Sequence, residues 1–296
     1  MKKPIFKGSG VAIITPYRNN QVDYEALGKL IDFQIAGGTA ALIVCGTTGE
    51  APTLSDEEHH ACISYAVQHV AGRIPVIAGA GSNDTQHATE MGIYAKTAGA
   101  DGVLMVTPYY NKPTQKGLLK QYTYIAERVD LPIILYNIPG RTGVSLTGPV
   151  LEELAKFPNI NGVKEASGNF ALINELMYRC GDDMNVWAGN DDITVPVLAM
   201  GGCGVISTAA NIVPQVMAEI CAKWFSGDHA AAAAMQLAHY DLLRDLFIET
   251  NPIPVKTAVN LMGMPGGDWR LPMCEMSEEN LIKLKKTLAR HGLIAG

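Results

Sequence analysis

The stretch ALIVCGTTGE, residues 41–50, shows the pattern from which the fold can be inferred. It begins with an uninterrupted apolar run and stops abruptly at a turn rich in glycine and threonine. The run does not alternate polar with apolar residues, so both faces of a strand formed here would be buried, which is typical of parallel sheets. An amphipathic segment follows, and Ser55 stands three residues ahead of Glu58, the pattern of a capping box that starts a helix. The stretch therefore predicts one strand–turn–helix unit.

The same design recurs along the whole chain. Strands are predicted at Val11–Ile14, Ala41–Val44, Pro75–Ala78, Gly102–Val106, Pro132–Tyr136, Gly162–Lys164, Asn185–Trp187 and Gly204–Ile206. Helical spacing of apolar residues predicts helices at Asp23–Ala36, Ser55–Val70, Asp84–Ala98, Thr114–Arg128, Thr147–Lys156 and Phe170–Cys180. Strand starts follow one another at roughly the length of a βα unit, about 25–35 residues.

Eight such units in series fit either a doubly wound sheet or a closed barrel. The count of eight and the even spacing favour an α/β fold of the (β/α)8 (TIM) barrel type, and 296 residues suit a barrel that folds as one unit. The strand signal ends after residue 206, and four further helices are predicted. We therefore expect a catalytic barrel over residues 1–226 and a C-terminal helical appendix over 227–296. The appendix helices and the one before them are expected at Ile212–Phe225, Asp228–Ile248, Val255–Met262 and Ser277–Arg290.

Composition excludes several classes of partner. The net charge is −6 and no basic block carries interleaved aromatics, so nucleic acid is not expected as a partner. No run of 18 apolar residues occurs and no apolar segment follows the first lysines, so neither a membrane span nor a signal peptide is expected. The six cysteines are scattered and read as reduced thiols, which predicts a cytoplasmic location. The seven histidines show no metal-binding spacing, so no metal site is expected.

The reactive groups of barrel enzymes lie at the carboxyl ends of the strands, and Lys164 is at such a position. Most other lysines lie in polar loops or on polar helix faces, whereas Lys164 ends a predicted inner strand. Burial disfavours the charged form of a lysine side chain, and condensation with a carbonyl requires the neutral amine. Lys164 is therefore a candidate Schiff-base lysine. The alternative is an ion pair with Glu165 or another carboxylate.

Other strand ends carry polar side chains that suit the same chemistry. Tyr136, on the adjacent strand, can pass protons during imine formation, or it can be a core tyrosine with a satisfied hydroxyl. Thr47 and Thr48 can offer donors to a carboxylate, or they can form a tight turn. Tyr110 lies in a loop, where packing or an interface is the simpler role. Arg141 suits bidentate capture of a carboxylate, and a surface ion pair is its alternative.

These residues coincide with the motifs of one known family. The chain resembles the dihydrodipicolinate synthase family, in the pyruvate-aldolase superfamily that includes N-acetylneuraminate lyase. The likeness runs almost end to end. It rests on GTTGE at residues 46–50, PYYN at 108–111, YNIPGRTG at 136–143, VKEASGN at 163–169 and NPIPVK at 251–256.

The resemblance implies a role for each candidate residue. Lys164 condenses with pyruvate, and the resulting enamine attacks L-aspartate 4-semialdehyde in the lysine and diaminopimelate pathway, with no cofactor besides the covalent imine. Thr48, Tyr136 and Tyr110 match a proton-relay triad. Thr47 and the backbone near Ile206 match contacts to the pyruvate carboxylate. Arg141 matches the residue that holds the carboxylate of the semialdehyde. The segment near its amino end is matched by Gly189, Asn190 and Asp191, although Asn190 replaces an aspartate that is common at this position in the family.

The resemblance also bears on assembly and regulation. Tyr110 would reach in from a neighbouring subunit, which implies at least a dimer, and the family is usually tetrameric. Lysine-inhibited members bind lysine with a histidine and a glutamate at positions that fall on Asp56 and His87 here. Tyr109, His59 and Asn83 match that site, whereas Ala51, Pro52, Asp56 and His87 do not. We therefore expect weak or absent inhibition by lysine.

Two other functions fit part of the pattern. A sister aldolase for sialic acid or a 2-keto-3-deoxy sugar acid would share Lys164 and Tyr136, but a polyol acceptor calls for hydroxyl partners rather than Arg141. A non-catalytic barrel that binds keto acids would have no use for a desolvated amine.

Overall fold

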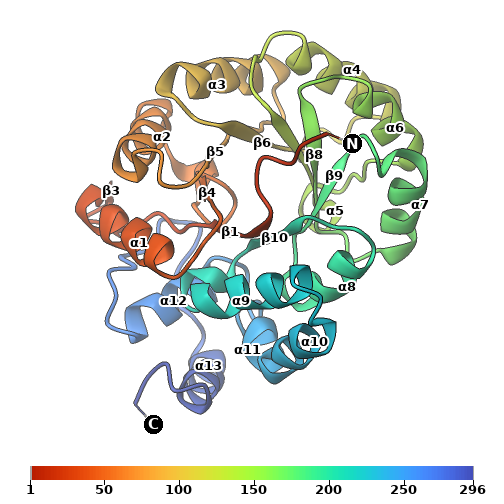
Figure 1. Cartoon of the computed structure of the whole chain (residues 1–296). Helices are drawn as coiled ribbons and strands as arrows, with labels where there is room; N and C mark the ends of the chain where they lie inside the picture. Colours follow the sequence, from red (N-terminus) through yellow and green to blue (C-terminus); the bar gives the residue numbers. More distant parts are fainter. Residues whose placement is uncertain (1, 296) are drawn as a thin grey trace.

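The computed structural model describes residues 2–295, and it shows a closed barrel of eight parallel strands surrounded by helices. Figure 1 shows the helices as a ring around the strands, with the blue C-terminal helices gathered on one side. The barrel strands are β1 (Gly8–Ala12), β4 (Ala41–Val44), β5 (Val76–Gly79), β6 (Gly102–Val106), β7 (Ile133–Asn137), β8 (Ile160–Glu165), β9 (Asn185–Ala188) and β10 (Gly204–Ser207). β10 pairs with β1 and closes the barrel. The predicted fold is confirmed.

The helices that cover the barrel begin where capping residues predict. Ser55 and Glu58 form both bonds of the expected capping box, and Asp84 accepts from two backbone amides at the start of the next helix. The helices around the strands are α1 (Tyr24–Ala36), α2 (Asp56–Val70), α3 (Thr85–Ala98), α4 (Gln115–Ala126), α6 (Gly148–Ala155), α7 (Phe170–Cys180), α8 (Thr194–Ala199) and α9 (Pro214–Phe225).

Two apolar layers build the core, as a closed barrel requires. One layer lies between strands and helices and includes Val163 and Leu135. The other fills the interior of the barrel and includes Tyr136, Trp187 and Ile206. Because successive side chains of a strand point to opposite faces, membership of these layers fixes which residues of β7 and β8 face inward. Tyr136 faces the interior.

Several elements differ from the sequence-based prediction. The predicted helix Asp228–Ile248 is wrong as one element, because it is two helices, α10 (His229–Ala238) and α11 (Tyr240–Asp245). Between them His239 leaves helical geometry, and its ring nitrogen contacts the carbonyl oxygen of Met235, a side-chain bond that competes with the helical ladder. Three further elements are absent from the prediction: α8, the short helix α5 (Pro139–Thr142) and the hairpin of β2 (Tyr17–Arg18) and β3 (Gln21–Val22).

The C-terminal chain runs back to the barrel. After α11 come α12 (Ile253–Leu261) and α13 (Glu278–Arg290), and α12 packs beside the turn that follows β10. No helix within residues 2–295 is both long and apolar enough to cross a bilayer.

Candidate active site

Lys164 lies near the carboxyl end of β8, with its side chain only 5% exposed. In register it lies beside Tyr136 of β7 and Trp187 of β9, both of which belong to the interior layer. Its Nζ is 4.4 Å from the centroid of the Tyr136 ring. The amine is therefore inside the barrel and against a phenol, as the sequence analysis expects.

No ion pair accounts for the burial of the Lys164 amine. Within residues 2–295 no carboxylate oxygen lies within ion-pair distance of Lys164 Nζ, whereas the other deeply buried lysine, Lys256, pairs with Glu50 at 2.7 Å. The neighbouring Glu165 points to the other face of β8, where it accepts hydrogen bonds from Asn137 Nδ2 at 2.8 Å and from the Ser167 amide at 2.6 Å. Burial raises the pKa of Glu165, and these two bonds act against that rise. The ion-pair alternative for Lys164 does not apply.

Thr47 and Thr48 lie in the turn after β4, and Thr48 is the more deeply placed. Thr48 is 2% exposed, and its Oγ1 accepts a hydrogen bond from Asn251 Nδ2 at 2.9 Å. Thr47 is half-buried. The turn is tight, because both Cys45 and Glu50 adopt positive φ. The structure therefore holds Thr48 by a residue from the C-terminal region.

Arg141 lies on the short helix α5, directly after β7, and its side chain is exposed. Its guanidinium donates from Nη2 to the backbone carbonyl of Asn251 at 2.9 Å. Asn251 thus contacts both Thr48 and Arg141. Asn251 belongs to the motif at residues 251–256, but nothing local in the chain predicts that it reaches the barrel mouth.

The remaining predicted residues surround the other strand ends. Ile206 on β10 is fully buried in the interior layer with Tyr136. Gly189 and Asn190 are half-buried in the turn after β9. Asp191 is 1% exposed, and its Oδ2 accepts from the amides of Thr208 at 3.1 Å and Ala209 at 3.0 Å. Burial raises the pKa of Asp191, and the bonds to its carboxylate oppose that rise. Its carboxylate therefore ties the β9 turn to the β10 turn.

Tyr110, unlike Tyr136, has no contact with Lys164 among residues 2–295. It lies in the loop after β6, its side chain is 89% exposed, and its hydroxyl forms no hydrogen bond with any residue from 2 to 295. Its φ is +71°, a left-handed conformation that is strained for a bulky side chain. Strain of this kind concentrates at functional sites.

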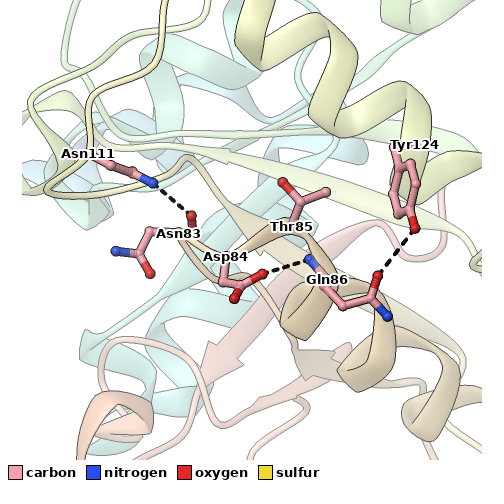
Figure 2. A pocket seen from close by; sticks show the side chains of 6 residues that line it. All are labelled: Asn83, Asp84, Thr85, Gln86, Asn111 and Tyr124. Atoms are coloured by element: carbon pink, nitrogen blue, oxygen red, sulfur yellow. Dashed lines mark hydrogen bonds between the residues drawn. The ribbon is translucent and has the colours of Figure 1, made fainter.

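A hollow of about 650 Å³ lies away from Lys164, between α3, α4 and the loop after β6. Figure 2 shows two hydrogen bonds that cross it, from Asn111 to the Asn83 carbonyl and from Tyr124 to Gln86. It holds neither the amine nor the phenol, so the chemistry is assigned to the barrel interior and not to this hollow.

The region expected to match a lysine site lies beside α2 and α3. His59 Nε2 is 2.8 Å from the Gly79 carbonyl oxygen, and burial lowers the pKa of His59. His87 Nε2 lies 3.8 Å from Asp56 Oδ1. Two of the four residues that depart from the family pattern, Asp56 and His87, therefore lie beside each other.

A buried amine with no carboxylate in ion-pair contact suits condensation with a carbonyl, so fold and site place this chain among the Schiff-base-forming, aldolase-type barrel enzymes. The model of the dihydrodipicolinate synthetase family matches residues 5–291. The chain belongs to that family, whose members are lyase-type enzymes that use pyruvate.

Relatives and solved structures agree with this assignment. The chain is 51% identical to the 4-hydroxy-tetrahydrodipicolinate synthase of Acetivibrio thermocellus, over 99% of this chain and 100% of the relative. It is 43% identical, with a TM-score of 0.94, to the chloride-inhibited dihydrodipicolinate synthase of Acinetobacter baumannii complexed with pyruvate, which covers 97% of this chain and 99% of that one. It is also similar to a dihydrodipicolinate synthase variant described as monomeric, at 44% identity and a TM-score of 0.96 over 98% of both chains.

Proposed function

We propose that Lys164 forms the Schiff base with pyruvate in the 4-hydroxy-tetrahydrodipicolinate synthase reaction, the activity named for the curated relatives. The observation that carries this proposal is the amine of Lys164, 5% exposed, lined by the Tyr136 ring and without a carboxylate partner in the described chain. A buried amine of this kind has no evident structural use, whereas Lys256 does.

The proposed reaction begins at the keto group of pyruvate. The amine of Lys164 adds to the carbonyl carbon, water leaves, and the imine loses a methyl proton to become an enamine. The hydroxyl of Thr47 and the backbone near Ile206 would hold the pyruvate carboxylate. Thr47 is half-buried beside Thr48, and Ile206 lines the barrel interior, so both can face a small acid bound to Lys164.

The enamine then attacks the aldehyde carbon of L-aspartate 4-semialdehyde. The new carbon–carbon bond turns that aldehyde into a hydroxyl, and the amino group of the semialdehyde displaces Lys164 as the ring closes. We assign the carboxylate of the semialdehyde to Arg141, which is exposed at the mouth and held by the Asn251 carbonyl. For its amino end we assign the turn Gly189–Asp191, with Asn190 in contact and Asp191 as the support beneath.

Proton transfer falls to Thr48 and Tyr136, with Tyr110 from a neighbouring subunit. The exposed, strained Tyr110 supports a role across an interface, which requires at least a dimer, and we propose a homotetramer. We also propose a cytoplasmic location, which is supported by six cysteines that are all unpaired in the described structure.

The experiment is a steady-state assay of wild type, Lys164→Ala and Arg141→Ala with two aldehydes. With pyruvate, we expect wild type to consume L-aspartate 4-semialdehyde and not a polyhydroxylated sugar aldehyde. Lys164→Ala should be inactive, and Arg141→Ala should lose at least about tenfold in kcat/KM for the semialdehyde, because a charge-assisted bidentate contact is removed. Preference for the sugar aldehyde would support the sister aldolase instead.

A further inference from the structure

We propose that Asn251 is a positioning residue that fixes the direction in which the hydroxyl of Thr48 donates its proton. The inference deepens the proposed function, since it assumes that Thr48 relays protons for chemistry at Lys164. It begins with one contact, in which the Asn251 amide Nδ2 donates to Thr48 Oγ1 at 2.9 Å. Both side chains are buried, with exposures of 5% and 2%.

The polarity of this contact limits what Thr48 can do. A hydroxyl has one proton and two lone pairs, whereas an amide nitrogen can only donate. While Asn251 Nδ2 occupies one lone pair of Thr48, the single Thr48 proton must point elsewhere. It is then available to another acceptor, and the proposed relay makes the phenol oxygen of Tyr136 that acceptor. A relay of hydroxyls transfers protons only when all its members donate in the same direction along the chain of hydrogen bonds. A fixed donor at one end of the relay sets that direction.

Asn251 makes no other side-chain hydrogen bond within the described residues. Its Oδ1 is buried without a partner. An unpaired buried acceptor is unfavourable, so a side chain selected only for stability would not be expected here. Its backbone carbonyl accepts from Arg141 Nη2 at 2.9 Å. One residue thus touches the proton relay by its side chain and the carboxylate-binding guanidinium by its backbone.

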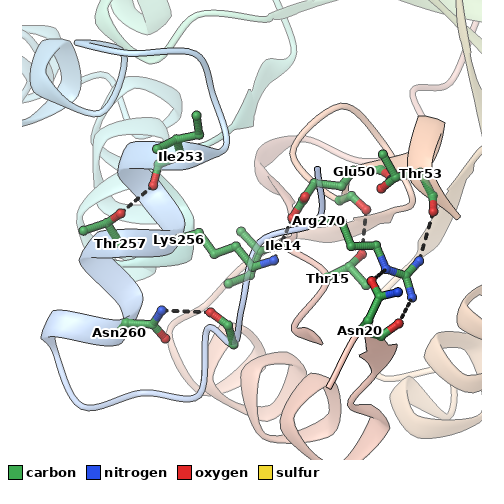
Figure 3. Close-up of polar contacts among 12 residues, drawn as sticks. Ile14, Thr15, Asn20, Glu50, Thr53, Ile253, Lys256, Thr257, Asn260 and Arg270 are labelled. Carbon is green, nitrogen blue, oxygen red and sulfur yellow. Dashed lines mark hydrogen bonds and ion pairs between the residues drawn. The ribbon is translucent and has the colours of Figure 1, made fainter. Parts of the chain in front are cut away.

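The segment that carries Asn251 is joined to the turn after β4 by a buried ion pair. Asn251 lies just before α12. Lys256 on that helix donates a hydrogen bond to Oε1 of Glu50 at 2.7 Å, and Glu50 follows Thr48 by two residues in the chain. Lys256 and Glu50 are 0% and 2% exposed. Figure 3 shows Lys256 and Glu50 meeting between the C-terminal chain and the loop after β4. The segment that carries Asn251 and the turn that carries Thr48 are therefore joined at two points.

The test replaces the donor without changing the shape. Asn251→Asp substitutes a carboxylate that only accepts, so the Thr48 proton would turn toward it. At pH 8 we expect kcat to fall about 100-fold, the scale of a lost proton-transfer group, with KM for pyruvate within about threefold of wild type. As pH falls and the new carboxyl gains a proton, it can donate again, so the activity of Asn251→Asp relative to wild type should rise.

Two further variants keep the test decisive if Asn251→Asp folds poorly. Asn251→Ala removes the donor but keeps the backbone carbonyl, so kcat should fall at least about tenfold while KM for the semialdehyde, which depends on Arg141, stays within about threefold. The matched control is Thr257→Val, a buried residue of the same segment whose hydroxyl bonds only to the Ile253 carbonyl, and it should keep kcat within about twofold.

The inference is overturned if Asn251→Asp or Asn251→Ala keeps more than about a third of the wild-type kcat, or if the loss in Asn251→Asp does not change with pH. Its failure is distinct from failure of the proposed function. Trapping of pyruvate on Lys164 in wild type, together with full activity of the Asn251 variants, would remove only the role of Asn251.

Discussion

Lys164 and Lys256 are both buried, yet their surroundings differ in kind. Lys256 contacts Glu50 at 2.7 Å and lies over the Tyr17 ring, so its charge is compensated. Lys164 lies over Tyr136 without any carboxylate partner in the described chain. Sequence alone pointed to Lys164, because a strand end can be recognised locally and the rule for barrel enzymes makes it a candidate. The contact partners of either lysine could not be read in the same way.

Asn251 shows why part of the site could not be predicted. Its partner Thr48 is 203 residues away along the chain, so no local pattern connects the two. Asp191 is similar, because only the folded chain shows that its carboxylate caps the amides of Thr208 and Ala209. Residue roles that depend on one strand end were accessible from sequence, and roles that depend on two distant segments were not.

Asp56 and His87 lead to a prediction about regulation. A lysine ligand brings an ammonium, and His87 stands where the family resemblance implies a glutamate in lysine-inhibited members. We expect half-maximal inhibition by lysine only well above low-millimolar concentrations, or none. His87→Glu should strengthen inhibition, because a carboxylate can pair with the ammonium. Initial rates with increasing lysine test this, and strong inhibition of wild type at low-millimolar lysine would contradict it.

At the scale of elements, the strand and helix pattern was largely readable. Six predicted helices of the barrel ring match observed ones to within two residues at each end. β1 was placed too late, since its first residues, Gly8-Ser9-Gly10, have weak strand propensity. The pairing of β1 with β10, which closes the barrel, explains these small residues. The two backbones approach so closely that a Cβ on Gly204 would lie 1.9 Å from the Gly8 carbonyl oxygen. Closure requires small residues that propensity disfavours.

The joint between the β4 turn and α12 leads to a prediction about stability. Burial lowers the pKa of Lys256 even though Glu50 acts to raise it, so desolvation outweighs the pair. Lys256→Met alone leaves the carboxylate of Glu50 buried without its partner and should lower the free energy of unfolding by about 3–5 kcal/mol. The double variant Glu50→Gln/Lys256→Met should lose less than Lys256→Met.

Urea unfolding of wild type, both single variants and the double variant gives this cycle. Additive losses would show that the pair does not couple the two segments. The same variants bear on the appendix, residues 227–296, which we propose supports the active site through Asn251 and Lys256 and so is not an independent unit.

At the scale of the whole molecule, stability should fall in alkaline solution. Burial raises the pKa of Cys221 from 9.0 to about 12 and also raises the pKa of Tyr17 and Tyr122. As pH rises, these groups lose their protons in the unfolded chain before they do so in the folded protein. Their contribution to folding stability is therefore complete below pH 9 for Cys221 and below about pH 10 for the tyrosines, and it is lost as pH rises toward the pKa values of the folded protein. In that range each such group lowers the free energy of unfolding by about 1.4 kcal/mol per pH unit.

Denaturant unfolding at pH 8, 9.5 and 11 measures this decline. Cys221→Ala should start from a lower stability and decline less steeply, because one of the retained protons is gone. A transition midpoint that stays level from pH 8 to 11 would show that these buried groups do not hold their protons as described.

Assembly gives a second prediction at this scale. If Tyr110 serves the site of its neighbour, inactive Lys164→Ala and weakly active Tyr110→Phe should complement each other. A mixed dimer has one site with both residues intact. After subunit exchange at equal concentrations we expect roughly a quarter of wild-type activity, since about half of the dimers are mixed. Activity equal to the mean of the separate variants would place Tyr110 outside the neighbouring site.

The central claim is that one shielded amine carries the chemistry, and reductive trapping tests it most directly. Wild type and Lys164→Ala would be treated with borohydride in the presence and absence of pyruvate, digested and examined by mass spectrometry. We predict a single pyruvate adduct, on the peptide that contains Lys164, and none in the variant. An adduct on Lys256 or any other lysine of wild type, or no adduct at all, would contradict the account.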